Sequence, residues 1–175
     1  MQKRIAQAKH SYITRNADLS VATKLGQGKP RSGDLMLARV DRIRHHTRLE
    51  NTFGRREHLY PGDEIIVAAA DRYATGQFHA QVPDQLGACH LVAAGGIAAE
   101  VIQRHAGVKG ATEITALGLL CDSTGNPLNL SQFAPLNTLK VSPVSLQKLP
   151  TLLVMGSDMN SGKTTLACAA ANGLR

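Results

Sequence analysis

Aromatic residues and cysteines are both scarce in this chain. It contains no tryptophan, three tyrosines and three phenylalanines, so it offers few rings on which the bases of single-stranded nucleic acid could stack. Its three cysteines, Cys89, Cys121 and Cys168, stand far apart and form no Cys-x-x-Cys pair. This spacing predicts neither a disulfide framework nor a zinc site, and it fits a reducing cytoplasm.

Long apolar runs are missing as well. No stretch approaches the roughly 18 consecutive apolar residues that a membrane-spanning helix needs. The opening residues, MQKRIAQAKHSYITRN, carry charge but lack the apolar core of a secretory signal. We therefore expect neither export nor membrane insertion, and we expect a cytoplasmic protein.

Acidic residues are outnumbered by basic ones. The formal net charge is +7 and the isoelectric point is about 9.7. An excess of positive charge attracts anions, and the candidates are a nucleotide, nucleic acid or a small acidic metabolite. The balance selects the sign of the partner's charge and nothing more.

The amino-terminal residues 1–30 have a helical pattern. Apolar residues between Ile5 and Leu25 recur mostly at three- and four-residue spacing, with charged residues between them. The glycines and the proline of residues 26–30 end the pattern. We predict one or two helices that pack on the core of the protein.

Residues 31–130 predict a small, β-rich α+β domain. The stretches SGDLMLARV (32–40) and PGDEIIVAA (61–69) share a Gly-Asp turn that enters an apolar strand. Between them, residues 42–60 predict two strands around a turn at Asn51 to Gly54. Short strands entered through such turns are typical of a small barrel-like sheet.

The later part of this domain predicts a strand followed by a helix. Gly95 and Gly96 form a turn, and a helix is expected from about Ile97 to His105. Two further strands are expected about a turn from Asp122 to Pro127. Residues 131–150 contain three prolines and few charges, so they are expected to be a linker.

The closing residues 151–175 predict a phosphate-binding loop. The apolar run TLLVM (151–155) is expected to be a buried strand, the loop GSDMNSGK follows, and TTLACAAANGL is expected to be a helix. Strand, glycine-containing loop, Lys-Thr and helix is the context that such a loop requires. Backbone N–H groups and the helix dipole would then face an anion.

Each side chain of this loop has an expected role. Gly162 allows close approach of the backbone, Lys163 can reach the β- and γ-phosphates, and the Thr164 hydroxyl is placed to complete the coordination of Mg²⁺. Thr165 can donate to the α-phosphate. The residues predicted to bind nucleotide are Gly156, Ser157, Asp158, Asn160, Ser161, Gly162, Lys163, Thr164 and Thr165.

The sequence G-S-D-M-N-S-G-K-T departs from the common pattern GxxxxGK[ST], because its first glycine is Gly156 and position 157 is serine. It resembles the loop of dethiobiotin synthetase and its relatives in the SIMIBI class of P-loop NTPases. In that loop a Gly-Thr-Asp opening precedes Gly-Lys-Thr at the same spacing. Ser157 replaces the threonine conservatively, and Asn160 stands where dethiobiotin synthetase has an acidic residue. The resemblance covers residues 151–175 only.

What the resemblance implies is a Mg²⁺-dependent nucleotide-binding protein, with ATP favoured over other nucleoside triphosphates. It implies ligase-like or kinase-like chemistry, in which a γ-phosphate activates a carboxylate or hydroxyl of a small acidic substrate. A complete P-loop domain needs several parallel strands with helices on both faces, and only its first strand, loop and helix are expected here. We therefore expect a truncated domain with weak or no activity, and an exposed strand at 151–155 through which the chain could form oligomers.

Several residues of the amino-terminal domain could bind an anion or a substrate. The polar stretch 70–84 brings Arg72, Tyr73 and His79 close together, and His90 follows it. Gly95 and Gly96 offer N–H groups to a carboxylate or phosphate if a helix follows, although tight packing explains the same glycines.

The adjacent pair His45 and His46 is expected to lie in a strand. Its side chains would then point to opposite faces, as solvated residues that could not easily share one metal ion.

An arginine-rich segment spans residues 39–56. Its basic residues are Arg39, Arg42, Arg44, Arg48, Arg55 and Arg56. They could grip phosphates, but Asp41, Glu50 and Glu57 interleave with them, so a salt-bridged outer face of a hairpin is at least an equal interpretation. This segment supplies the alternative function, a non-enzymatic module that binds nucleic acid or another anion. The low aromatic content counts against nucleic acid.

Overall fold

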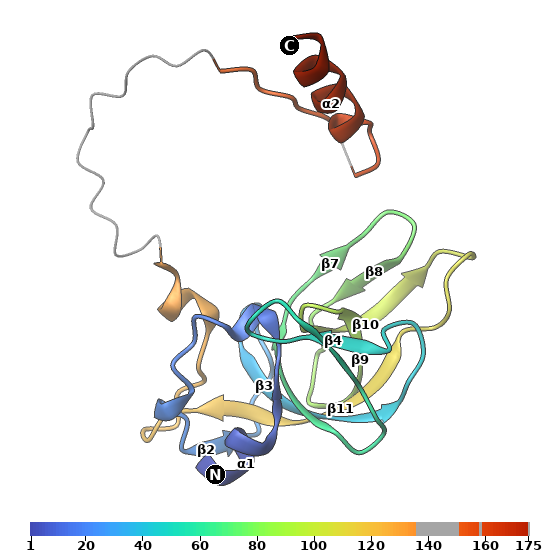
Figure 1. Ribbon diagram of the computed structural model, residues 1–175. Helices are drawn as coiled ribbons and strands as arrows, with labels where there is room; N and C mark the ends of the chain where they lie inside the picture. Colours follow the sequence, from blue (N-terminus) through green and yellow to red (C-terminus); the bar gives the residue numbers. More distant parts are fainter. Residues whose placement is uncertain (136–150, 158, 175) are drawn as a thin grey trace, which may run out of the picture. The chain divides into compact units, whose positions relative to one another are not determined.

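The computed structural model describes residues 1–135, 151–157 and 159–174. The chain divides into two compact units, Met1–Thr138 and Leu139–Arg175, which are described separately (Figure 1). The described residues combine two α-helices with a predominance of strands, so the α+β class is confirmed. No helix within these residues is long and apolar enough to span a membrane.

The described residues of the first unit, 1–135, form one α-helix, eleven strands and three short 3₁₀ helices. These elements are α1 (Gln2–Gln7), β1 (Lys9–His10), η1 (Tyr12–Thr14), η2 (Leu19–Val21), β2 (Lys24–Gly26), β3 (Leu35–Arg42), β4 (Arg48–Glu50), β5 (Arg56–His58), β6 (Glu64–Ala69), β7 (Arg72–Tyr73), β8 (Phe78–Gln81), β9 (Gly87–Ala93), β10 (Ile97–Arg104), β11 (Thr112–Cys121) and η3 (Leu130–Phe133). The second unit contains α2 (Lys163–Gly173).

The main sheet has nine strands, and an additional pairing joins β6 and β10, which are not neighbours in its linear order. Its order is β1-β6-β3-β11-β9-β10-β8-β7, with β2 added beside β11. Strand β10 pairs antiparallel with β9 and parallel with β6, where Ile97 lies opposite Ala68. Strands β6, β3, β11, β9 and β10 therefore form a ring of pairings, while β4 and β5 form a separate two-stranded ladder (Figure 1).

The two predicted Gly-Asp strands are confirmed as β3 and β6. Each follows a glycine with positive φ, Gly33 at 88° and Gly62 at 91°, a conformation that glycine adopts without steric cost. The strands pair antiparallel, with Leu35 opposite Ala68 and Arg39 opposite Glu64. The predicted hairpin around Asn51 to Gly54 is also confirmed, as β4 and β5.

Strands β3 and β6 are buried on both faces, which explains their unbroken apolar runs. On one face, Met36 and Ile65 join a core cluster with residues of β9 and β11. On the other face, Leu35 and Ile66 pack against Ile5 of α1. A third, smaller cluster forms around Phe78 of β8, together with Val92 and Ala99.

The predicted helical pattern of residues 1–30 is wrong beyond α1. The chain instead makes β1, two short 3₁₀ turns and β2. Ser11 explains the early end of the helix, since its N–H and its hydroxyl both donate to the carbonyl of Ile66 in β6. Pairing with the sheet thus satisfies backbone groups that a longer helix would have satisfied internally.

The helix predicted from Ile97 to His105 is also wrong, because these residues form β10. The turn from Asp122 is present, but a second strand after it is not: β11 is a single strand, and Pro127 makes only an isolated bridge to Cys121. Of the predicted linker 131–150, residues 136–150 lie outside the described residues, and the start of the segment belongs to η3.

Candidate functional site

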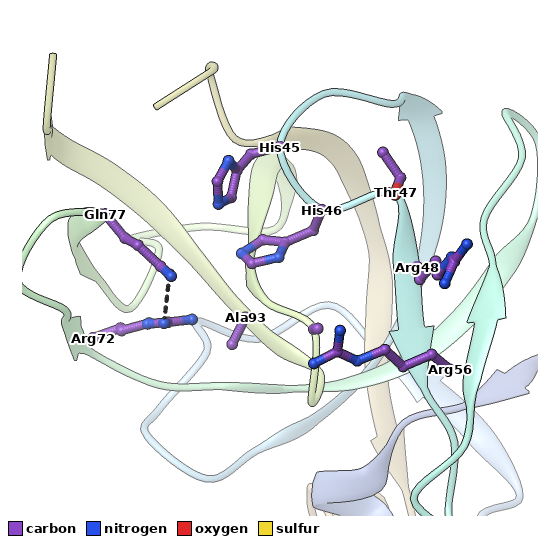
Figure 2. Close-up of a pocket in the computed structure, with 9 residues that line it drawn as sticks. His45, His46, Thr47, Arg48, Arg56, Arg72, Gln77 and Ala93 are labelled. Atoms are coloured by element: carbon purple, nitrogen blue, oxygen red, sulfur yellow. Dashed lines mark hydrogen bonds between the residues drawn. The ribbon is translucent and has the colours of Figure 1, made fainter. Parts of the chain in front are cut away.

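A pocket of about 500 Å³ opens in the first unit, and basic side chains surround it (Figure 2). Three segments far apart in sequence form it: the bend after β3 with the β4–β5 ladder, strand β7 with the turn that follows it, and the turn between β9 and β10. The lining residues are His45, His46, Thr47, Arg48, Arg56, Arg72, Gln77, Ala93 and Ala94. None of these described residues is acidic.

The arginines of the pocket lack carboxylate partners. Arg48, Arg56 and Arg72 take part in none of the ion pairs formed among the described residues. Glu50 lies opposite Arg56 in the β4–β5 ladder, yet the two side chains do not form an ion pair. The pocket therefore carries a concentration of positive charge that the surrounding protein does not neutralise.

Arg72 and His46 are held by the same carbonyl group. The carbonyl oxygen of Val92 accepts a hydrogen bond from Nη1 of Arg72 and lies 2.9 Å from Nε2 of His46. Nη2 of Arg72 donates to Oε1 of Gln77 over 2.8 Å (Figure 2). Since the partners of the Arg72 guanidinium are neutral oxygens, they position the group without cancelling its charge.

Burial lowers the pKa values of both groups. The pKa of His46 falls to about 4, chiefly because burial disfavours its charged form, and the positive charges of His45 and Arg72 act in the same direction. The pKa of Arg72 is also lowered by burial. At neutral pH His46 is therefore uncharged. Its Nε2–H donates to the carbonyl oxygen of Val92, and its Nδ1 is able to accept a hydrogen bond.

The prediction that His45 and His46 are solvated residues on opposite faces of a strand is wrong. Strand β3 ends at Arg42, and both histidines lie in the bend that follows and line the pocket. Their rings meet edge to face at 4.8 Å, and His45 also meets the buried ring of Phe78 at 5.3 Å.

A buried hydroxyl, that of Thr112, fixes this bend. Its Oγ1 accepts from the N–H of Arg44 at 3.0 Å and donates to the carbonyl of His46 at 2.7 Å. Sequence reasoning missed Thr112, because a single threonine at the start of a strand carries no signal of its own.

The substrate residues predicted around Arg72 are divided between two places. Arg72 and Tyr73 are neighbours in β7 and point to opposite sides, so Arg72 enters the basic pocket while Tyr73 pairs with His79 at a ring distance of 5.8 Å. Tyr73 and His79 line a separate hollow of about 280 Å³. His90 in β9 lines neither, and its Nδ1 is buried without a hydrogen-bond partner among the described residues.

Gly95 and Gly96 form the tight turn between β9 and β10, and the anion site predicted from a following helix has no helix behind it. The N–H of Gly96 donates to the carbonyl of Ala93, and the carbonyl of Gly95 accepts from Ile13. Gly96 is buried with φ of 103° against Ser11. Close packing of the turn accounts for these glycines.

The arginine-rich segment 39–56 is also divided, at the bend. In β3 and the first part of the bend, Arg39 pairs with Asp41 at 3.0 Å and Arg44 pairs with Glu113 at 2.6 Å, as a salt-bridged face predicts. After it, Arg48 and Arg56 line the pocket, as an anion site predicts.

In the second unit, the loop that precedes α2 folds back on itself. A Cβ atom on Gly156 would lie under 3.0 Å from Oγ of Ser161 and from Cγ of Lys163, so the glycine is in close contact with the far side of the loop. Asn160 and Gly162 both have positive φ, at 63° and 82°. Successive turns of this kind aim backbone N–H groups into one concavity.

This concavity has a volume of about 310 Å³ and is lined by residues 160–165. Nζ of Lys163 lies 3.1 Å from Oγ of Ser161. Thr164 and Thr165 occupy the first turn of α2, where an α-helix has no internal acceptor for their N–H groups. Ser157 is exposed, and Asp158 lies outside the described residues.

The helix predicted in this segment is confirmed as α2, but the strand predicted at 151–155 is not present. Residues 151–155 pair with no strand among the described residues, and Leu152, Leu153 and Met155 are exposed. A strand is stabilised by its neighbours, and no P-loop domain is formed by the described residues of this unit.

The donors available for Mg²⁺ are correspondingly few. Mg²⁺ prefers oxygen ligands and is commonly held by one or two carboxylates together with phosphates and water. The described residues of the second unit supply hydroxyl groups, that of Thr164 among them, and no carboxylate. This donor set fits a Mg²⁺ ion that arrives with the phosphates of a nucleotide, and it does not fit a site made by protein ligands alone.

Comparison of the chain with known proteins gives no relative to interpret: no protein-family model, no curated protein and no solved structure matches it.

Proposed function

We propose that the loop from Gly156 to Thr165 binds the phosphates of a nucleoside triphosphate, ATP in the first instance, together with Mg²⁺. The observation that carries the proposal is the folding of Gly156 against Ser161 and Lys163, which curls the backbone around the amino terminus of α2. An anion in this concavity is stabilised by N–H groups of the first helical turn and by the helix dipole.

The proposed roles follow from the positions of the side chains. Lys163, whose ammonium group lies beside Ser161 at the rim of the concavity, neutralises the β- and γ-phosphates. Thr164 gives its hydroxyl to Mg²⁺, and Thr165 donates to the α-phosphate. Mg²⁺, when bound, would withdraw negative charge from the phosphate oxygens.

In a complete domain this loop would serve ligase-like or kinase-like chemistry, and the loop with α2 alone would turn over weakly or not at all. The first unit would then bind the substrate. We propose that its ring of paired strands is the small barrel expected from the sequence, and that it forms a rigid base for the basic pocket.

Titration of the ¹⁵N-labelled chain with Mg²⁺-ATP tests the proposal, because amide shifts detect even millimolar binding. The expected result is a saturable shift of the amides of residues 160–165, lost or weakened at least about tenfold in Lys163→Ala. Gly156→Ala should weaken binding as well, since the added Cβ opens the loop.

Gly173→Ala is the matched control for that glycine variant. It makes the same chemical change at the end of α2, where a Cβ meets no atom within 4 Å, and it should leave binding unchanged. Absence of a saturable shift at residues 160–165, or shifts of these amides that survive Lys163→Ala, would refute the proposal.

The second candidate function is binding of nucleic acid by the arginine-rich segment 39–56. It is supported by Arg48 and Arg56, which have no ion-pair partner among the described residues. It is weakened by the ion pairs of Arg39 and Arg44, which leave fewer arginines for a phosphate backbone. Binding of a single-stranded oligonucleotide with a steep salt dependence would favour it.

A further inference from the structure

The basic pocket of the first unit is formed by other residues than the phosphate loop, and its geometry points to a ligand of its own. We infer that the pocket formed by His46, Arg48, Arg56 and Arg72 binds a small polyanionic metabolite, one that carries phosphate or carboxylate groups and a hydroxyl. This inference names the class of substrate that the proposed enzyme would act on, but the pocket stands on observations independent of the loop.

The first argument is the uncompensated charge of Arg72. Its side chain is partly buried, and its hydrogen-bond partners are the carbonyl of Val92 and the amide of Gln77. Removing a guanidinium from water without a counter-ion is unfavourable, and two further arginines nearby add repulsion. An anion in the pocket would remove both costs.

Second, the side of the pocket formed by His46 and Arg72 is fixed before any ligand arrives. Val92 holds His46 and Arg72 in one arrangement, and Thr112 holds the bend that carries His46. Sites whose side chains are already oriented lose less entropy on binding than surface lysines and arginines that must be ordered.

The third argument concerns size and hydrogen-bond type. A volume of about 500 Å³ matches the size of a small metabolite. Neutral His46 keeps its Nδ1 as an acceptor, and no described residue donates to it. A hydroxyl beside the anionic groups of the ligand would supply that donor.

The test is titration of the full chain carrying Lys163→Ala, so that binding at the phosphate loop is removed in advance. The probes are inorganic pyrophosphate and citrate, followed by calorimetry and by the amide shifts of residues 45–48, 72 and 92–94. Saturable binding of either probe supports the inference. Preference for pyrophosphate indicates a phosphorylated ligand, and preference for citrate indicates a carboxylate ligand.

Arg48→Gln and Arg56→Gln are the informative variants, because both side chains are exposed and make no ion pair among the described residues. Each should weaken probe binding about fivefold to twentyfold without changing the melting temperature. Arg42→Gln removes the same charge from an exposed position in β3 outside the pocket, and it should change binding less than twofold.

Equal weakening by Arg42→Gln would overturn the inference, since it would show diffuse attraction to a basic surface. Absence of saturable binding by both probes would also overturn it, as would tighter binding of an oligonucleotide that displaces them. If the chain with native Lys163 shows no amide shift at residues 160–165 with Mg²⁺-ATP, while the Lys163→Ala chain binds the probes, this inference stands and the phosphate-loop proposal is refuted.

Discussion

Replacing Gly96 by alanine should destabilise the first unit strongly. Gly96 has φ of 103°, a conformation in which an alanine costs about 1–3 kcal/mol. A Cβ atom there would also lie under 3.0 Å from Oγ and Cβ of Ser11, whose side chain is fully buried and bound to the carbonyl of Ile66. Overpacking of this kind adds about 1–3 kcal/mol, so the expected loss in free energy of unfolding is about 2–6 kcal/mol.

Urea denaturation of Gly96→Ala measures this loss, and Gly62→Ala separates its two causes. Gly62 has φ of 91°, but a Cβ there meets no atom within 4 Å, so the expected loss is about 1–2 kcal/mol from backbone strain alone. In the double variant Ser11→Gly with Gly96→Ala, the steric part should be recovered as a favourable coupling energy. Equal losses in Gly96→Ala and Gly62→Ala, or additivity with Ser11→Gly, would refute the packing argument.

Three further predictions concern the pocket and the thiols. The pKa of His46 is about 4 in the folded chain and near 6.5 in the unfolded chain, so the unfolded chain binds more protons between these values. The free energy of unfolding should therefore fall by about 1–3 kcal/mol as pH drops from 6.5 to 4, and thermal melts of His46→Gln should lack this component. Thr112→Val removes a buried hydroxyl with two hydrogen bonds and should lower the free energy of unfolding in urea by about 1–3 kcal/mol. Thr115→Val removes an exposed hydroxyl bound to Asp41 and should cost less than about 1 kcal/mol, and equal losses would contradict the role of Thr112 in the bend. Cys168 is exposed, whereas Cys89 and Cys121 are buried and burial raises the pKa of Cys89 to about 11. Ellman's reagent should therefore titrate one thiol in the native chain and three after unfolding, and fast reaction of the native Cys168→Ser variant would show that Cys89 or Cys121 is accessible.

The strands that could be predicted from the sequence are those with strong local signals. β3 and β6 begin after Gly-Asp turns, and each contains an apolar run, residues 35–38 and 65–69, so turn chemistry and burial indicate the same structure. α2 was also predictable, because alanine and leucine favour a helix there and no neighbouring strand among the described residues competes for its backbone.

β10 could not be predicted in the same way, because its alanines and its apolar spacing favour a helix. Its conformation is decided by partners that are distant in sequence: β6, β8 and β9 all pair with it. Ala98 and Ala99 are fully buried between them. Long-range pairing therefore overrides a helical preference that amounts to a few tenths of a kcal/mol per residue.

The candidate pocket was partly predictable for a similar reason. Arg72 stood out as a basic residue in a polar stretch, and the arginine density of residues 39–56 predicted an anion site in general terms. His46 was missed because the end of β3 at Arg42 was not recognised, and a strand extended through the histidines places them on opposite faces. The residues that end the strand, Thr112 and Gly110, lie in a distant part of the sequence and bind the bend by hydrogen bonds.

The bend at residues 43–47 also decides between the two interpretations of the arginine-rich segment. On the β3 side, cross-strand partners are within reach, and Glu113 of β11 pairs with Arg44. Beyond the bend, the chain leaves the main sheet and forms the separate β4–β5 ladder, where Arg48 and Arg56 do not pair with Glu113 of β11 and line the pocket instead. A salt-bridged face and an anion site are thus consecutive parts of one segment, and the hydroxyl of Thr112 sets the boundary between them. If that is correct, Thr112→Val should weaken pyrophosphate or citrate binding even though Thr112 does not line the pocket, while Thr115→Val should leave it unchanged.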